Sequence, residues 1–127
     1  MNIRITAGQI ELLGTLEDNP TARDFAALLP VTLTLSDFAG TEKISDLPRR
    51  LDTADAPAAH TGRPGDITYY APWGNLALFY GQGPDANRLV LLGRIRPTDV
   101  QALSGLSGDV TLTAQSPLDS RSDTPGS

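Results

Sequence analysis

Short segments in which apolar and polar residues alternate recur along almost the whole chain, and they limit the fold more than any other feature. The clearest segment is 31–35, where Val31, Leu33 and Leu35 face one way and two threonines face the other. A period of two residues is the pattern of a strand with one buried face. Alternating or continuously apolar segments predict further strands at 2–6, 10–16, 41–44, 66–70, 76–80, 89–95 and 109–114.

Two short segments have the pattern of helices instead. Asn19 precedes Pro20, a pair that favours a helix start because the Asn side chain caps free N–H groups and proline fits the first turn. Apolar residues then follow at helical spacing up to Leu29, before Pro30 ends the pattern. A second short helix is predicted at 97–103. Because helices this short need a packing partner, we expect both to lie over the ends of the sheet structure.

The strand count favours an antiparallel barrel or sandwich, and a closed barrel would also remove exposed sheet edges. The chain of 127 residues suffices for one core, and we place the barrel domain at 1–114. Residues 115–127 are rich in Ser, Asp, Pro and Gly, so we expect a disordered tail there. Residues 53–65 have no apolar periodicity and predict a long loop, and 81–87 predict a turn.

Charge and residue counts exclude several classes of function. Ten basic and fifteen acidic residues give a net charge of -5, which argues against nucleic acid as a partner. The chain has no cysteine, which excludes thiolate sites, and its single histidine, His60, excludes a multi-histidine metal site. We therefore expect no metal and no cofactor. Without a long apolar stretch or a signal-peptide pattern, we expect no membrane partner and a cytoplasmic location.

Three stretches carry a more specific signal. They read Leu-Pro-Val-Thr-Leu-Thr-Leu-Ser-Asp-Phe-Ala-Gly-Thr-Glu-Lys at 29–43, Leu-Pro-Arg-Arg-Leu at 47–51, and Gly-Asp-Ile-Thr-Tyr-Tyr-Ala-Pro-Trp-Gly-Asn-Leu-Ala-Leu-Phe-Tyr at 65–80. With Leu-Gly-Arg-Ile at 92–95, they resemble the small bacterial proteins of the cyclophilin-like fold. The resemblance covers about residues 1–114. It implies a mainly β fold, a closed eight-stranded antiparallel barrel with two short capping helices.

The resemblance also suggests a chemistry. Cyclophilins isomerise X-Pro peptide bonds, using an apolar pocket for the proline ring and an arginine that stabilises the twisted amide, along one face of the barrel. In this comparison Leu76 takes the place of the cyclophilin glutamine, and Leu78 that of the pocket phenylalanine. Arg49 and Arg50 are the candidates for the arginine.

Five residues are the candidates for a binding cleft on the side of the barrel. Trp73, in a Pro-Trp-Gly turn, is expected to form a pocket wall, and strand alternation places Tyr69 and Tyr70 on opposite faces, with one of them outward or at the rim. A carboxylate in such a cleft accepts hydrogen bonds, and a guanidinium binds an anionic or carbonyl group. The candidates are Glu42, Arg49, Arg50, Tyr70 and Trp73.

Several functions remain open at this point. The first is a domain that binds a small molecule or an extended peptide without established catalysis. The alternative is a weak peptidyl-prolyl isomerase, and a third is a module that binds another protein. Each candidate residue also has a structural explanation, since charged side chains are mostly solvated and aromatic ones mostly pack in cores. His60 is expected to be exposed and inert in its loop.

Overall fold

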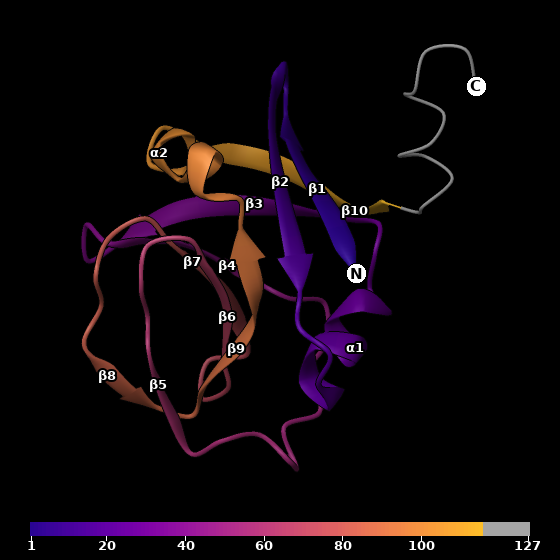
Figure 1. Ribbon diagram of the computed structural model, residues 1–127, viewed down its shortest axis with the longest axis vertical. Coiled ribbons are helices and arrows are strands. Elements are labelled where there is room, and N and C mark those ends of the chain that lie inside the picture. Colours follow the sequence, from indigo (N-terminus) through magenta and orange to yellow (C-terminus); the bar gives the residue numbers. More distant parts are fainter. Residues whose placement is uncertain (116–127) are drawn as a thin grey trace.

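Eight strands of the computed structural model, which describes residues 1–115, hydrogen-bond in a ring and close a barrel (Figure 1). Going round the barrel, the strands are β1 (Asn2–Ala7), β10 (Gly108–Gln115), β3 (Val31–Phe38), β4 (Glu42–Asp46), β7 (Asn75–Phe79), β6 (Asp66–Tyr70), β9 (Leu89–Ile95) and β2 (Ile10–Leu16). Every neighbouring pair is antiparallel. The expected mainly β, closed eight-stranded antiparallel barrel is therefore confirmed.

Alternation in the sequence fills the interior of the barrel. On β1, Ile3 and Ile5 are fully buried, while the residues between and beside them are more exposed. On β3, Leu33 and Leu35 are buried in the same cluster, and Leu33 lies directly opposite Val110 of β10. Burying an aliphatic side chain of this size contributes roughly 1.5–3 kcal/mol. The interior cluster is therefore the main source of stability of the fold.

The first helix, α1 (Pro20–Ala26), begins as the sequence predicts. The side chain of Asn19 accepts a hydrogen bond of 2.8 Å from the backbone N–H of Ala22, and so caps the first turn. Phe25 is completely buried in the interior cluster. The helix is shorter than expected, because it ends at Ala26 rather than near Leu29. Its packing through Phe25 compensates for its short length.

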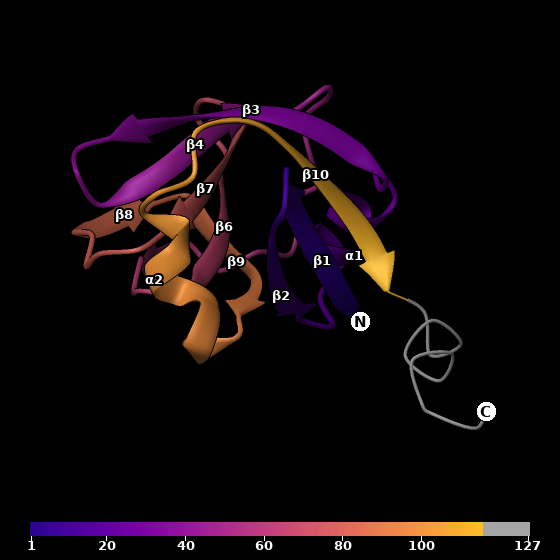
Figure 2. The same cartoon turned by 90° about the horizontal axis from the view of Figure 1, so that it is seen from above.

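The second helical segment consists of a 3-10 turn, η1 (Pro97–Asp99), followed directly by α2 (Val100–Leu103). Leu103 is fully buried in the same interior cluster as the barrel residues. The two helical segments lie far apart on the barrel (Figures 1 and 2). The expectation of two short helices is confirmed. Among residues 1–115, no helix has the length and apolar character that crossing a bilayer requires.

Two further strands correct the sequence-based prediction. β5 (Ala59–Thr61) lies within the segment 53–65 that predicted a loop, and β8 (Asp85–Asn87) lies within the predicted turn at 81–87. They pair with each other as a separate two-stranded sheet outside the barrel, which we call the flap. Strands of three residues are too short to show alternation, so the sequence pattern gave no signal for them.

Phe79 of β7 is where the flap packs on the barrel. Its ring is buried, and the flap approaches it through two glycines. A Cβ atom on Gly62 would lie 2.4 Å from Cζ of Phe79, and one on Gly83 would lie 2.6 Å from Cε2 of the same ring. Only glycine allows so close an approach of the backbone. The flap is therefore held against the outer side of the barrel by this aromatic side chain.

Two boundaries also differ from the prediction. β3 continues through Phe38 instead of ending at residue 35, and the chain reverses at Ala39 and Gly40, both of which have positive φ angles. The predicted tail begins at 115, but Gln115 is the last residue of β10. The rest of the predicted tail lies outside the described residues.

Candidate functional site

β7 is buried on both sides, which is unusual for a strand of a small barrel. All five of its residues are buried. Leu76 and Leu78 belong to the interior cluster, whereas Ala77 and Phe79 belong to a second, smaller cluster outside the barrel. Because side chains alternate along a strand, Asn75 shares the outer side with Ala77 and Phe79. The outer face of the barrel at β7 therefore carries a second small core of its own.

A hollow of about 290 Å³ lies on this outer face, and we call it the aromatic hollow. Its floor comes from β4 and β7, and its sides come from the turn after β3, the β6–β7 connection and the flap with the start of β9. The residues that line it are Phe38, Ala39, Thr41, Glu42, Ile44, Tyr70, Trp73, Asn75, Phe79, Pro84, Ala86 and Leu89.

Three aromatic rings form one wall of the aromatic hollow. The rings of Trp73 and Phe38 meet edge to face, with centroids 5.4 Å apart, and those of Trp73 and Tyr70 do so at 5.3 Å. Such pairs stabilise each other beyond simple burial. Even so, Trp73 is 54% exposed and Phe38 is 41% exposed. Folding therefore leaves large apolar surface at the rim of this hollow.

The Glu42 carboxylate is the only charged group in this lining. Glu42 lies opposite Phe79 in the β4–β7 pairing, so both side chains are on the outer face. Burial raises the pKa of the Glu42 carboxyl above its ordinary value, and the Thr41 hydroxyl, which donates to it at 3.5 Å, partly offsets the rise. The carboxylate thus lies in an environment that disfavours its charge.

Asn75 supplies an amide group to the lining of the aromatic hollow. It is only 3% exposed, and its side-chain Oδ1 has no hydrogen-bond partner among residues 1–115. A buried polar atom without a partner loses its hydration and gains nothing in return, which costs on the order of 1–3 kcal/mol. Asn75 is therefore suited to interact with a group that is not part of the chain.

The five residues predicted for the cleft fall into two groups. Glu42, Tyr70 and Trp73 line the aromatic hollow, so the structure brings these three together. Arg49 and Arg50 do not belong to its lining.

Each of the two arginines has a partner elsewhere. Both terminal nitrogens of Arg49 donate to the carboxylate of Asp24 at 2.9 Å, and this hydrogen bonding lowers the pKa of Asp24. Arg50 donates through Nη1 to the carbonyl oxygen of Ala71 at 2.7 Å, and its side chain packs beside Gly74. Arg50 therefore supports the loop that carries the aromatic wall, whereas Arg49 ties the chain to α1.

The residues of β7 that face the aromatic hollow are not the two that the resemblance to cyclophilins singled out. Leu76 and Leu78, which it places at the glutamine and phenylalanine positions, are fully buried inside the barrel. The outward residues of the strand are the ones that the sequence analysis did not select, among them Asn75 and Phe79. Phe38 was missed as well, because the segment 36–40 was interpreted as a turn. The sequence pattern does not distinguish Asn75 from Leu76 as the outward residue, because both faces of β7 are buried.

His60 is not the exposed loop residue that the sequence predicted. Its side chain is 24% exposed, and Nε2 lies 2.9 Å from Oδ2 of the buried Asp66. The same carboxylate accepts hydrogen bonds from Nε of Arg94 at 3.2 Å and from the backbone N–H of Arg63 at 3.1 Å. Asp66 is thus surrounded by donors, as a buried carboxylate requires. This cluster connects the flap with β6 and β9 of the barrel.

A second group of charges lies at the edge of the barrel, near the aromatic hollow. Lys43 is buried, and its Nζ lies 2.9 Å from Oδ1 of Asp37 and 5.6 Å from the centre of the Tyr80 ring. Hydrogen bonds from Lys43 and from the Tyr80 hydroxyl lower the pKa of Asp37, and the bond to Asp37 raises the pKa of Tyr80. Within residues 1–115, no three His, Asp or Glu side chains are grouped to bind a metal ion.

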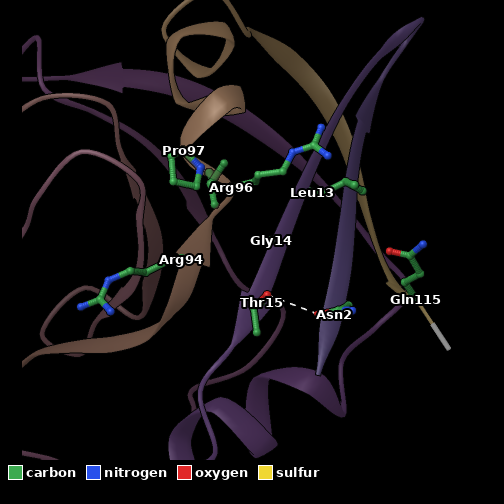
Figure 3. Close-up of a pocket in the computed structure, with 9 residues that line it drawn as sticks. Asn2, Leu13, Gly14, Thr15, Arg94, Arg96, Pro97 and Gln115 are labelled. Atoms are coloured by element: carbon green, nitrogen blue, oxygen red, sulfur yellow. Dashed lines mark hydrogen bonds between the residues drawn. The ribbon is translucent and has the colours of Figure 1, made fainter. Parts of the chain in front are cut away.

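A groove of about 400 Å³ lies elsewhere, beside the segment where β2 pairs with β9 (Figure 3). Two exposed arginines border it, and Figure 3 shows their side chains extending in different directions. Sequence analysis gave no indication of this groove. Its lining consists of Asn2, Leu13, Gly14, Thr15, Arg94, Ile95, Arg96, Pro97 and Gln115.

Comparisons with known proteins agree on the fold. A sequence profile described as the cyclophilin-like family matches residues 5–115. The hypothetical protein AF2241 from Archaeoglobus fulgidus, solved in solution, superimposes with a TM-score of 0.63 at 21% identity, over 91% of this chain and 95% of that one. McbB, solved in complex with tryptophan, superimposes with a TM-score of 0.64 at 15% identity, over 89% of this chain but only 44% of McbB. No match was found among curated proteins.

Proposed function

This chain belongs to the cyclophilin-like family, and we propose that it is a domain that binds a small molecule in the aromatic hollow. The observation that carries the proposal is the Asn75 amide oxygen, which is buried and unpartnered in a lining that is otherwise mostly apolar. A ligand that donates a hydrogen bond to Asn75 would remove the cost of leaving that atom unpaired. Few convergent polar groups in an apolar hollow are typical of small-molecule sites.

The exposed rings support a ligand with a flat apolar body. Trp73 and Phe38 leave apolar surface exposed side by side, and such patches commonly mark binding sites. McbB was solved with an aromatic small molecule, tryptophan. At 15% identity the likeness extends to the fold alone, so tryptophan serves here as a starting probe.

Other functions receive less support from the same geometry. An isomerase of the cyclophilin kind would need an arginine beside its apolar pocket, and neither Arg49 nor Arg50 lines the aromatic hollow. An extended peptide would need a long open surface, whereas this hollow is bordered by the flap on one side and the Trp73 loop on another. A compact ligand fits the volume of about 290 Å³ better.

The proposal is tested by titrating ¹⁵N-labelled protein with tryptophan and a panel of one-ring and two-ring aromatic compounds. We expect at least one compound to shift backbone amides at residues 41–42 and 70–75 most strongly. Trp73→Ala should weaken that binding roughly three- to tenfold, because the aromatic contact is lost. Shifts confined to the groove of Figure 3, or no shift with any compound, would overturn the proposal.

Ile10→Ala provides the matched control. Ile10 is 46% exposed, close to the exposure of Trp73, and it lies at the β1–β2 turn away from the aromatic hollow. The substitution removes exposed apolar surface without touching the proposed site. Binding should be unchanged in this variant.

A further inference from the structure

Resting on the proposed function, we infer that the aromatic hollow selects ligands that carry a protonated amine and no carboxylate, in preference to free amino acids and organic acids. The inference concerns the sign of the charge that the site accepts. It follows from the polar groups of the lining, from the partners of the nearby cations and from the aromatic wall.

The only charge that the lining side chains within residues 1–115 offer is negative. Glu42 contributes a carboxylate, Asn75 contributes an amide whose oxygen has no partner, and the Tyr70 hydroxyl can donate or accept. The Thr41 hydroxyl already donates to Glu42. An ammonium group has three donors and no acceptor, so it matches this set of atoms.

Among residues 1–115, no positively charged side chain belongs to the lining, and the contacts of Lys43 and Arg50, on neighbouring segments, lie outside it. Lys43 follows Glu42 on β4, so it faces the opposite side of the strand, where it binds Asp37. The guanidinium of Arg50 donates to the carbonyl oxygen of Ala71, behind the loop that carries the aromatic wall. A ligand carboxylate would therefore meet no counter-charge in the hollow.

The charge of Glu42 also favours an ammonium group over a carboxylate in the ligand. A ligand carboxylate beside it would place two negative charges in a partly desolvated site, where repulsion is stronger than in water. An ammonium group would instead supply the counter-charge that the half-buried Glu42 lacks in the free protein. The raised pKa of the Glu42 carboxyl agrees with this lack of a partner.

The aromatic wall adds a second preference for cations. The faces of Trp73, Tyr70 and Phe38 carry negative potential, and a cation within about 6 Å of such a ring is attracted to it. The ring of Trp73 is nearly perpendicular to the rings of Phe38 and Tyr70, with interplanar angles of 87° and 83°. Ring faces are thus presented in more than one direction around the site.

Four probes that share one phenylethyl body test the inference: 2-phenylethylamine, 2-phenylethanol, phenylalanine and 3-phenylpropionate. Trp73 is the only tryptophan of the chain, so its fluorescence reports on the hollow directly. Excitation at the red edge of its absorption avoids the phenyl probes. We expect the amine to bind about tenfold more tightly than the neutral alcohol, and both carboxylates to bind more weakly than the alcohol.

Two substitutions that remove the same charge locate the preference. Glu42→Gln should bring the affinities of amine and alcohol within about twofold of each other, mainly through weaker binding of the amine, because the ion pair is lost. Glu11→Gln is the matched control, because Glu11 pairs with Arg4 on the β1–β2 hairpin, away from the hollow. This variant should keep the full preference for the amine.

The outcomes separate the inference from the proposed function. If no probe changes the fluorescence of Trp73 and none shifts amides of the hollow, the proposed function fails and the inference fails with it. If the probes bind without preference for the amine, or 3-phenylpropionate binds most tightly, the inference is wrong and the proposed function stands. A preference that persists in Glu42→Gln would overturn the role given to Glu42.

Discussion

Two of the hollows on the outer surface of the molecule differ in how their polar groups are used. The groove beside β2 and β9 is the larger, at about 400 Å³ against about 290 Å³ for the aromatic hollow. In the groove, the Thr15 hydroxyl donates to Asn2 at 3.3 Å, and Nε of Arg96 donates to Asp99 at 3.1 Å. In the aromatic hollow, the amide oxygen of Asn75 has no partner within residues 1–115.

This difference shows that size alone does not identify a binding site. The groove lies beside paired segments of β2 and β9, and the Thr15 hydroxyl and the Arg96 guanidinium of its lining already have hydrogen-bond partners. The aromatic hollow combines exposed rings with a half-buried carboxylate and an unpaired amide, which are costs that a bound molecule would reduce. On this ground we propose that a ligand binds in the aromatic hollow and not in the groove.

The largest effect on stability is expected where β9 pairs with β2, beside the groove. A Cβ atom on Gly93 would lie 2.2 Å from the carbonyl oxygen of Thr15 and 2.8 Å from Cα of Leu16, and neither backbone atom moves without separating β9 from β2. Gly93→Ala should lower the free energy of unfolding by about 3 kcal/mol in a urea titration. A loss below about 1 kcal/mol would show that β2 and β9 can shift apart more easily than the structure indicates.

A smaller loss is expected where the flap meets the aromatic hollow. Gly62→Ala would push a methyl group against the ring of Phe79. A side-chain ring can move more easily than the paired backbones of β2 and β9, so the loss should be smaller than for Gly93→Ala. We expect a loss of about 1–2 kcal/mol in urea, with weaker ligand binding because Phe79 lines the hollow. Gly105→Ala is the control, since its methyl group would meet only an atom at 3.7 Å. Equal losses in the two variants would contradict the close contact.

Substitution of each of the two neighbouring arginines, Arg49 and Arg50, shows which of them supports the aromatic hollow. Arg50→Ala removes the hydrogen bond to the carbonyl oxygen of Ala71 and should weaken ligand binding about three- to fivefold, because the Trp73 loop loses a support. Arg49→Ala removes the same charge and the bond to Asp24, and should leave binding unchanged. Isothermal titration of both variants measures the difference. An effect of Arg49→Ala on affinity would place the site nearer to α1 than we propose.

The smallest effect concerns the stability of the unliganded hollow as a function of pH. Burial raises the pKa of Glu42 in the folded state, so ionisation of this group costs stability as the pH rises through that raised pKa. Glu42→Gln should therefore have a slightly higher Tm than the wild type at neutral pH. The gain should disappear when the pH falls below the ordinary glutamate value of 4.5, where both states are protonated. A gain that is independent of pH would contradict this explanation.

Much of the barrel could be predicted from the sequence, because one-sided burial leaves a visible pattern. The strands at 2–6, 31–35 and 109–114 alternate, and each packs one face into the interior. The flap could not be predicted in this way. Its strands have three residues each, and their position depends on the ring of Phe79, which is distant in the sequence.

The candidate site could be predicted only in part, for a related reason. β7 is buried on both faces, so burial imposes no alternation on it, and the choice between Asn75 and Leu76 as the outward residue left no trace in the sequence. A slip of one residue in such a strand exchanges its two faces. The ion pair of Arg49 with Asp24 could not be predicted either, because only the tertiary fold brings these two residues together.

A crystal structure of the protein with 2-phenylethylamine tests the central claim most directly. The claim is that the aromatic hollow, and not the larger groove, receives the ligand. We expect the phenyl ring against Trp73 and the ammonium group within hydrogen-bond distance of Glu42 and Asn75. A ligand seated beside Gly14 and Arg96, with the aromatic hollow unchanged, would contradict the claim.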